Sequence, residues 1–520
     1  MKMMPTAEPS DAATGATSAA PAAPAPRWLT ALFLLGLIGY AWFLGHNIGA
    51  YAGGADSSGY MNNAKLIAQG KISTPQRTLP GLTGPVTSYT FVPLGFIPST
   101  DNTQLIPSYP IGLPLLVAAS AAVVGWDAAP HLTIALHAFL GVVMLWQLAR
   151  ALGFSPAWSM FAATLLGACP LYVFFSLQMM SDVPATAWAL AAIGCAWRSR
   201  HNARWSLAAG FAFGFAVLVR PTNVILALPV ACALGLRWRS WLGCALGGIP
   251  AGAAFLLYNR AAYGHALASG YGAVGGMFQW EHVPASLANY AHWLPVLLTP
   301  FGLLALGLPW CFRRDPWLTA TLALWLLLPL ALYAYYYHTH ETWWYLRFVL
   351  PAFPAAWLAA LLVGRELVRR WNLRRWFPAD QLRTRLTVGS VCTALLVFVW
   401  QWNRHLHTRD CGVGERTYLA AINWMRPQVP AQAVLIAMQC SGALFYYTDY
   451  TIARWDQFEG VHFLSLIRAA QAAQRPLYAL LMPFEEDRVF SEGRLPGRWT
   501  KLGTVSDISL WRFDGASAQP

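Results

Sequence analysis

Two acids at the edges of apolar segments are the residues of this chain best suited to chemistry. Asp56 follows the first long apolar segment, and Asp182 stands between two later ones. A carboxylate at such a boundary can act as a general base when it lies within hydrogen-bond reach of an acceptor hydroxyl or amine. Two carboxylates can also share a divalent cation such as Mg²⁺ or Mn²⁺, which prefers oxygen ligands. Both acids stand where a helix pattern begins, so capping that helix is an alternative role for each.

Two arginines occupy similar boundaries. Arg347 precedes the apolar run Phe-Val-Leu-Pro, and Arg220 precedes Pro-Thr-Asn. A guanidinium there suits bidentate binding of a phosphate group. The alternative is that each side chain reaches to the membrane interface without binding anything.

The residues around Arg347 invite two further interpretations. The run Trp343-Trp344-Tyr345 is typical of an aromatic belt at a membrane surface, and sugar stacking is the alternative. His338-Thr-His-Glu341 suggests a metal site, but alternate residues on an irregular loop rarely converge on one ion. The candidates for sugar or acceptor contacts are Tyr60, Trp344, Tyr345 and Glu341.

The composition requires these residues to be held by membrane-spanning helices. The chain has 520 residues, of which 57% are hydrophobic and 11% charged, whereas soluble domains average about 25% charged residues. Apolar stretches long enough to span a bilayer recur along the chain. Most of the net charge of +13 lies in short loops, where it fixes topology. The sequence has no basic stripe with interleaved aromatics, so nucleic acid is not an expected partner. It also has no glycine-rich phosphate loop, so hydrolysis of a nucleotide is not expected.

The positive charge alternates between loops and predicts the topology. The spanning segments that we predict are 28–46, 130–149, 156–176, 184–197, 205–219, 222–236, 240–258, 291–311, 317–337, 346–363 and 386–402. Alternate loops hold fifteen arginines, which places those loops and the N-terminus in the cytoplasm. The apolar segment 109–126 contains two prolines and would invert every later loop, so we expect it to lie in the outer interface. The prediction is then eleven crossings, with Asp56, Asp182, Arg220 and Arg347 on the outer face.

Three further regions complete the expected organisation. Residues 1–27 are rich in Ala and Pro and are expected to be disordered in the cytoplasm, ahead of a transmembrane domain over 28–402. The outer loop 47–129 is long enough to be functional. Residues 403–520 predict a small α/β domain outside the membrane. Its expected helices are 414–425 and 458–474, and its expected strands are 433–438, 477–481, 499–505 and 508–513. Cys411 and Cys440 would be candidates for a disulfide in this domain.

Taken in order, these motifs resemble the C-type (GT-C) integral membrane glycosyltransferases, a superfamily that contains protein O-mannosyltransferases and lipid A aminoarabinose transferases. The matching elements are Asp56 with its helix, Tyr109-Pro-Ile-Gly-Leu-Pro-Leu-Leu, Ser181-Asp182-Val-Pro, Arg220-Pro-Thr, Arg347-Phe-Val-Leu-Pro and an extracytoplasmic C-terminal domain. The resemblance spans residues 28–500. No single motif is specific, whereas their order and sidedness together are.

The resemblance implies a fold, a reaction and a location. The fold would be a polytopic α-helical bundle in the bacterial inner membrane, with a periplasmic α/β domain. Asp56 would be the catalytic base or the acid that orients the acceptor, and Asp182 would support the acceptor or a metal. Arg347, Arg220 and Tyr109 would hold the phosphate of a polyprenyl-phosphate sugar donor, and the transfer would invert the anomeric centre. The acceptor would be a glycolipid, a polysaccharide or a protein.

The chain departs from the family pattern at two positions. Ser57 and Ser58 follow Asp56 where the mannosyltransferases have a second acid, and Tyr109 stands where the aminoarabinose transferases have a phosphate-binding lysine. Both departures leave the sugar and the acceptor open. The alternatives to a transferase are a transporter or flippase for lipid-linked glycans and a non-catalytic assembly protein. A transporter would favour ionisable groups near the bilayer midplane and internal repeats, and neither is visible here.

Overall fold

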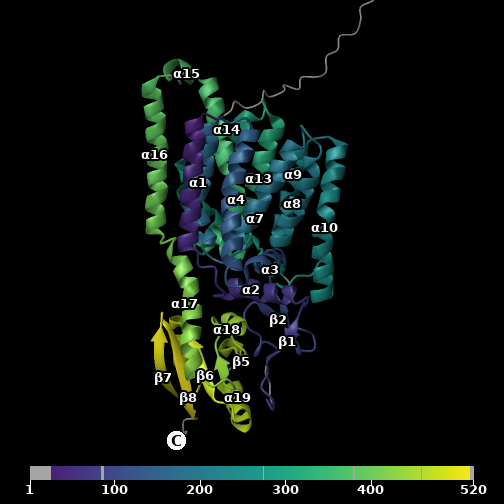
Figure 1. The fold of residues 1–520 in the computed structure, drawn as a ribbon, viewed down its shortest axis with the longest axis vertical. Coiled ribbons are helices and arrows are strands. Elements are labelled where there is room, and N and C mark those ends of the chain that lie inside the picture. Colours follow the sequence, from purple (N-terminus) through teal and green to yellow (C-terminus); the bar gives the residue numbers. More distant parts are fainter. Residues whose placement is uncertain (1–24, 83–86, 273, 379–380, 458–459, 516–520) are drawn as a thin grey trace, which may run out of the picture.

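The computed structural model describes residues 25–82, 87–272, 274–378, 381–457 and 460–515. Residues 1–24, most of the segment expected to be disordered, lie outside that range. Figure 1 shows a bundle of helices standing side by side, with a smaller mixed α/β part beyond one end. This arrangement agrees with the fold class expected from the sequence.

The bundle contains α-helices joined by short 3₁₀ segments. The α-helices are α1 (Arg27–Asn47), α4 (Ala129–Ala151), α5 (Pro156–Ala168), α6 (Pro170–Ser176), α7 (Asp182–Arg198), α8 (Trp205–Val219), α9 (Ala227–Leu234), α10 (Trp238–Tyr263), α11 (Val283–Leu297), α12 (Thr299–Gly302), α13 (Pro316–Ala334), α14 (Phe353–Arg370), α15 (Leu373–Trp376) and α16 (Leu382–His405). The 3₁₀ segments are η1 (Pro221–Leu226), η2 (Val274–Met277), η3 (Trp280–His282), η4 (Leu303–Cys311), η5 (Tyr337–His340) and η6 (Trp343–Ala352).

Burial separates the central helices of the bundle from its outer ones. Residues 353–363 of α14 are buried on every side, which makes α14 a central helix. By contrast, α1, α10 and α16 carry rows of exposed leucine, valine and tryptophan side chains. Helices that expose apolar residues in this way are expected to face lipid. Among the described residues, six helices are long and apolar enough to cross a bilayer, or eight if each bent pair forms one span, so the eleven crossings remain a prediction.

Two of the predicted spans are wrong as continuous helices. The span 156–176 is broken at Cys169 into α5 and α6, which meet at 59°. Pro170 causes the break, because proline lacks an N–H and forces the preceding residue out of the helical region. The span 291–311 is replaced by α11, which begins earlier at Val283, and by a bend of 118° before Thr299–Cys311. Thr299 has a positive φ of 62° at that bend and precedes Pro300.

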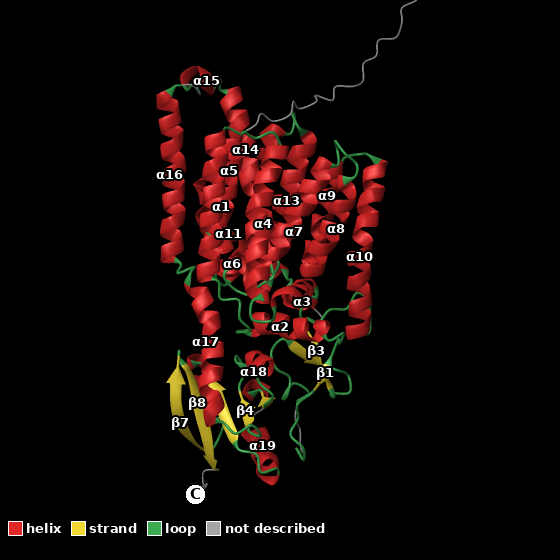
Figure 2. Cartoon of the chain, viewed as in Figure 1, coloured by secondary structure: helices red, strands yellow, loops and turns green. Residues whose placement is uncertain are grey.

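The outer loop folds into two helices and a small sheet at one end of the bundle. The helix α3 (Gly112–Val124) has 13 residues, about 20 Å, which is too short to span a bilayer. It lies beside α2 (Ala55–Ala68) at the end of the bundle (Figure 2), and the interfacial position of 109–126 stays a prediction. The strands β1 (Thr74–Pro75), β2 (Phe96–Pro98) and β3 (Gln104–Pro107) form an antiparallel sheet in the order β1-β3-β2.

The C-terminal part is built on a five-stranded sheet with the order β5-β4-β6-β8-β7. Its strands are β4 (Val434–Ile436), β5 (Thr451–Ala453), β6 (Leu477–Leu481), β7 (Arg498–Val505) and β8 (Ile508–Gly515), and its helices are α17 (Asp410–Met425), η7 (Arg426–Gln428), α18 (Ser441–Tyr447), η8 (Trp455–Gln457), α19 (Gly460–Ala472) and α20 (Pro483–Ser491). The predicted elements of this part are present, although residues 458–459 of the predicted helix lie outside the described residues. The prediction missed β5, which has three residues, and two short helices, α18 and α20, the second of which has a charged first turn.

The C-terminal part is docked on the outer loop by close backbone contact. A Cβ atom on Gly49 would overlap the backbone of Gly412 on α17, and a Cβ on Gly442 would overlap Ser58 on α2. Side chains add to this contact. Asn62 donates to the Gly442 carbonyl at 3.1 Å, and Lys65 donates to the Tyr446 carbonyl at 3.1 Å. The helix α2 is therefore sandwiched between the bundle and α18.

Glu415 on α17 is a partly buried contact between these parts. Ser57 donates to its Oε2 atom at 2.6 Å, and the backbone N–H groups of Gly53 and Gly54 also lie against it. A Cβ on Gly53 would overlap the same carboxylate. Burial raises the pKa of Glu415 from 4.5 to about 7, because it outweighs the hydrogen bond from Ser57 and those N–H groups. Glu415 thus contacts the N-terminal turn of α2 from a distant part of the chain.

Replacing Glu415 with glutamine should remove one pH-dependent contribution to stability. Folded Glu415 keeps its proton up to about pH 7, whereas an unfolded glutamate loses its proton near pH 4.5. The contribution is therefore present at low pH and is lost as the pH rises through that window, by at most about 3 kcal/mol. Among its neighbours, Asp56 has a lowered pKa and Cys411 has a pKa raised by burial to about 12, so neither titrates there.

Thermal unfolding of the detergent-solubilised protein between pH 5 and pH 8 measures this effect. The stability of wild type relative to Glu415→Gln should fall from pH 5 to about pH 7 and then level off. The exposed Glu492→Gln is the matched control and should track wild type. Parallel curves for wild type and Glu415→Gln would contradict the assignment.

Candidate active site

Two carboxylate–guanidinium pairs lie at the end of the bundle that faces α2. Arg347 on η6 donates from Nη2 to Asp56 Oδ2 at 2.8 Å, and Arg220 donates from Nη2 to Asp182 Oδ1 at 2.6 Å. Arg220 also donates to the backbone carbonyl of Arg347 at 3.3 Å, which joins the two pairs. The structure therefore brings together the four residues that the sequence singled out at segment boundaries.

Asp56 sits in the first turn of α2 without capping it. The N-cap position is Gly54, and no side chain caps the helix there. Asp56 instead accepts hydrogen bonds from Arg347 and from the Tyr109 hydroxyl, the latter at 2.6 Å to Oδ1. Its position at the helix N-terminus still favours a negative charge through the helix dipole. The capping alternative for Asp56 is thus replaced by pairing with two other side chains.

The partners of Asp56 lower its pKa. Burial by itself would raise the pKa of this carboxyl, but the positive charge of Arg347 and the hydrogen bond from Tyr109 outweigh it. Asp56 is therefore ionised at neutral pH and is a weaker base than an isolated aspartate. In this arrangement it can orient an acceptor and receive its proton during the transfer, without holding that proton afterwards.

The second pair is more deeply buried than the first. The side chain of Asp182 is 1% exposed and that of Arg220 11%, against 25% for Asp56 and 16% for Arg347. Asp182 is the first residue of α7 and does not occupy its N-cap, which is Ser181. Its Oδ2 atom is buried without a hydrogen-bond partner among the described residues. The pair of Asp56 and Arg347 is thus the more accessible of the two.

Tyrosine side chains line the space between the two acids. Tyr60 on α2 donates to the Ser181 hydroxyl at 2.9 Å, and its ring lies 4.9 Å from that of Tyr109. Tyr271 packs edge-on against Tyr109 with ring centroids 5.9 Å apart. Tyr263 donates to the Pro107 carbonyl at 2.8 Å, so the chain after α10 is held against the outer loop.

The aromatic residues before Arg347 separate into two groups. Trp343 is buried and packs edge-on against Phe174 at 5.1 Å, so it belongs to the core and not to an interfacial belt. Trp344 is exposed, and Tyr345 lies 5.9 Å from the Arg347 guanidinium. Phe348 lies 5.0 Å from the same guanidinium. The side of Arg347 away from Asp56 is therefore lined by aromatic rings.

The His338–Glu341 segment forms a local ion pair. His338 Nδ1 lies 2.7 Å from Glu341 Oε1, and the His338 ring stacks on Tyr345 at 4.9 Å. Within the described ranges, no group of three or more His, Cys, Asp or Glu side chains could hold a metal ion. Asp56 and Asp182 fit a divalent cation poorly, because each already has a guanidinium against its carboxylate. We therefore assign no step to a metal.

Sequence reasoning missed Glu415, which lies next to Ser57 and so close to Asp56. The sequence held one signal for it, namely that no second acid follows Asp56. In the structure, α17 brings a carboxylate to Ser57 from 358 positions away. One other expectation needs correction. Cys411 and Cys440 are both free, and Cys411 donates to the Phe174 carbonyl at 3.1 Å, so the candidate disulfide is wrong.

A family model matches part of the chain. Residues 108–259 match the family model described as dolichyl-phosphate-mannose-protein mannosyltransferase, a segment that includes Tyr109, Asp182 and Arg220. Comparison with the curated proteins finds no match.

Solved structures show the fold over almost the whole chain. The chain is similar to ArnT from Cupriavidus metallidurans bound to undecaprenyl phosphate, with a TM-score of 0.55 at 12% identity, covering 95% of this chain and 100% of that one. It is also similar to the oligosaccharyltransferase of Archaeoglobus fulgidus tethered to an acceptor peptide, with a TM-score of 0.55 at 12% identity, covering 95% and 74%. For arabinofuranosyltransferase AftD from Mycobacteria, the TM-score is 0.51 at 12% identity, covering 95% and 42%. The chain therefore has the fold of the C-type (GT-C) integral membrane glycosyltransferases.

Proposed function

We propose that this protein is a membrane glycosyltransferase that moves a sugar from a polyprenyl-phosphate donor to an acceptor on the extracytoplasmic face, with inversion. The observation that carries the proposal is the ion pair of Asp56 and Arg347, which sets an acid beside a guanidinium suited to phosphate at the end of the bundle next to α2. The ArnT structure similar to this chain contains undecaprenyl phosphate, which supports a lipid phosphate as the donor's carrier. The acceptor is a glycolipid, a polysaccharide or a protein.

The proposed reaction needs only the residues around this pair. An acceptor oxygen or nitrogen forms a bond to the anomeric carbon, and the bond from that carbon to the phosphate oxygen breaks. The electron pair leaves with the polyprenyl phosphate, and the acceptor proton passes to Asp56 and then to water. Attack opposite the leaving phosphate inverts the anomeric centre. The donor stores the energy in its glycosyl phosphate bond, so no nucleotide is consumed.

The two arginines have different parts in this scheme. Arg347 is the more exposed and would bind the donor phosphate while it stays within reach of Asp56. Arg220 would add positive charge next to Arg347, because it is bound to Asp182 and to the Arg347 carbonyl. Asp182 would act as a positioning residue through Arg220. Tyr60, Trp344, Tyr345 and Glu341 remain proposed contacts for the sugar or the acceptor.

The proposal includes the orientation of the chain. Residues 28–402 would form the transmembrane domain in a bacterial inner membrane, with the N-terminus in the cytoplasm. Residues 403–520 would form the periplasmic domain, which is docked next to Asp56. Membrane lipids and a lipid-linked donor are thus the expected partners.

Two other functions fit the structure less well. A transporter for lipid-linked glycans would place ionisable groups near the bilayer midplane, whereas Asp56 and Asp182 begin helices next to the outer loop. A non-catalytic assembly protein would tolerate the loss of Asp56, because its function would rest on the docking surface of the C-terminal part.

Replacing Asp56 with asparagine should abolish transfer. Asparagine keeps the shape of the side chain but removes the charge, so we expect a loss of about 10²- to 10⁴-fold, the usual range for a general acid–base group. Glycan and lipid profiling of a deletion strain, complemented with wild type or Asp56→Asn, measures the outcome. Asp101→Asn in the same outer loop is the matched control and should restore the wild-type profile. Identical profiles for wild type and Asp56→Asn would favour the assembly protein.

Replacing Tyr109 with phenylalanine separates two roles for this residue. The resemblance assigns Tyr109 to the donor phosphate, whereas the structure bonds its hydroxyl to Asp56. A hydrogen bond to a charged group contributes about 1.5–3 kcal/mol, so losing it should lower kcat about 10- to 100-fold. If Tyr109 acts through Asp56, the KM for the donor should stay within about twofold of wild type. A raised donor KM with unchanged kcat would instead place Tyr109 at the phosphate.

A further inference from the structure

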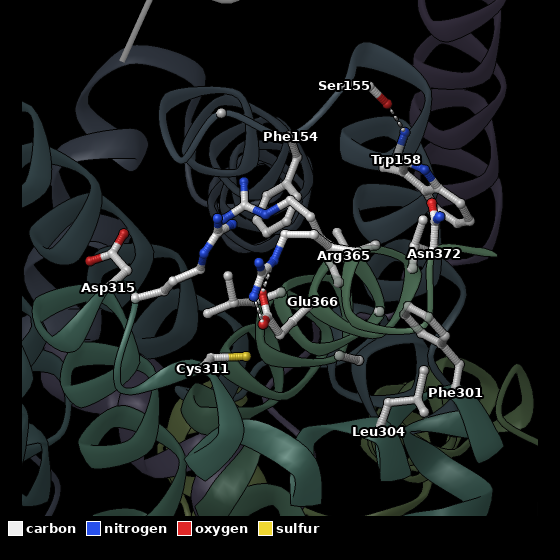
Figure 3. A pocket seen from close by; sticks show the side chains of 18 residues that line it. Phe154, Ser155, Trp158, Phe301, Leu304, Cys311, Asp315, Arg365, Glu366 and Asn372 are labelled. Carbon is white, nitrogen blue, oxygen red and sulfur yellow. Dashed lines mark hydrogen bonds and ion pairs between the residues drawn. The ribbon is translucent and has the colours of Figure 1, made fainter. Parts of the chain in front are cut away.

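A large cavity lies at the end of the bundle away from Asp56. It has a volume of about 1000 Å³ and lies between α14, η4 and the start of α5 (Figure 3). Its walls come from Phe154 before α5, from Trp158 on α5, from Phe301 and Leu304 around the 118° bend, and from residues 360–372 at the end of α14. This cavity takes no part in the site described above.

One side of this cavity is cationic. Arg314, Arg365 and Arg369 all line it, together with the acids Asp315 and Glu366. Both acids are engaged elsewhere. Asp315 Oδ1 caps α13 by accepting from the Leu318 N–H at 3.1 Å, and Glu366 is paired with Arg369.

Arg314 and Arg365 are the two remaining arginines, and Glu366 attracts Arg314 only from beyond ion-pair distance. Within the described residues, neither Arg314 nor Arg365 has an acidic partner within ion-pair distance. Arg365 lies 5.1 Å from the centre of the Phe154 ring, which holds its guanidinium at the cavity wall. Two guanidinium groups with open donors at the edge of a cavity form a binding site for a phosphate group.

The other side of the cavity is apolar. Phe301, Leu304, Leu361 and Trp158 line it, and Figure 3 shows Phe301 and Leu304 on the opposite side of the view from Asp315. A soluble anion would leave this apolar surface uncovered. A ligand that matches both sides has a phosphate head group and hydrocarbon chains.

We propose that this cavity binds an anionic phospholipid of the leaflet on the side away from the reaction. Basic pockets between transmembrane helices on the cytoplasmic side are suited to anionic head groups, and the distribution of positive charge places these arginines on that side. Phosphatidylglycerol fits best, because phosphatidylethanolamine would bring an ammonium group to a cationic site. The bound lipid would fill the space beside the bend at Thr299 and support the segment 299–311.

The donor lipid does not explain the same cavity. A polyprenyl phosphate at Arg347 would have its phosphate at the opposite end of the bundle, next to α2. The inference therefore goes beyond the proposed function, and its test does not use transfer activity.

The experiment compares full-length protein in nanodiscs of phosphatidylethanolamine alone and with added phosphatidylglycerol. Thermal unfolding is recorded as phosphatidylglycerol is titrated, and bound lipids are identified by native mass spectrometry. The test variant is Arg314→Gln with Arg365→Gln, and the matched control is the exposed neighbour Arg313→Gln, which does not line the cavity. Inorganic phosphate is titrated in a separate arm.

Wild type and Arg313→Gln should retain phosphatidylglycerol and gain stability from it. Each arginine lost should weaken binding about fivefold, so the double variant should bind about 25-fold more weakly. The readout is the gain in stability on adding lipid, so a general loss of stability in the double variant does not imitate it. Leu304→Trp, which fills the apolar side and keeps both charges, should also reduce retention. Four outcomes would each overturn the proposal. They are equal stabilisation by phosphatidylethanolamine, unchanged lipid binding in the double variant, retention of polyprenyl phosphate instead of phosphatidylglycerol, and stabilisation by inorganic phosphate.

Discussion

The ion pair of Asp56 and Arg347 is the interaction on which the rest of this structure depends. It joins the first turn of α2 to η6 across 291 positions of the chain. A carboxylate and a guanidinium taken out of water are costly unless each is paired and hydrogen-bonded. Tyr109 supplies the second bond to the acid, and the aromatic ring of Phe348 flanks the cation. A lipid phosphate bound at Arg347 would compete with the Asp56 carboxylate for the guanidinium and would weaken the ion pair of Arg347 and Asp56.

The position of Asp56 depends on parts of the chain far from it. The helix α2 is packed between the bundle and α18, and its N-terminal turn contacts Glu415 of α17. Because Gly49 and Gly53 carry no Cβ, the backbone before α2 can approach α17 closely. The C-terminal part therefore contributes to the geometry of the site without supplying a group to the reaction.

The sequence predicted the fold class, the four boundary residues and most elements of the C-terminal part. These follow from local signals, namely apolar runs, alternating positive loops and period-two strands. The sequence-based prediction failed where contacts between distant parts of the chain determine the structure. Glu415 carries no local signal of its contact with Ser57, and Cys411 was expected as half of a disulfide, although its thiol bonds to Phe174 of α6. The bend at Thr299 was missed because apolar composition continues through it.

Affinity for undecaprenyl phosphate, measured on the purified protein, tests the central claim most directly. If Arg347 divides its charge between Asp56 and the donor phosphate, Arg347→Gln should weaken binding at least about tenfold, since hydrogen bonds to charged groups contribute about 1.5–3 kcal/mol. Asp56→Asn should bind at least as tightly as wild type, because Arg347 then loses its competing anion. Equal affinity in Arg347→Gln and wild type, or weaker binding in Asp56→Asn, would contradict the account.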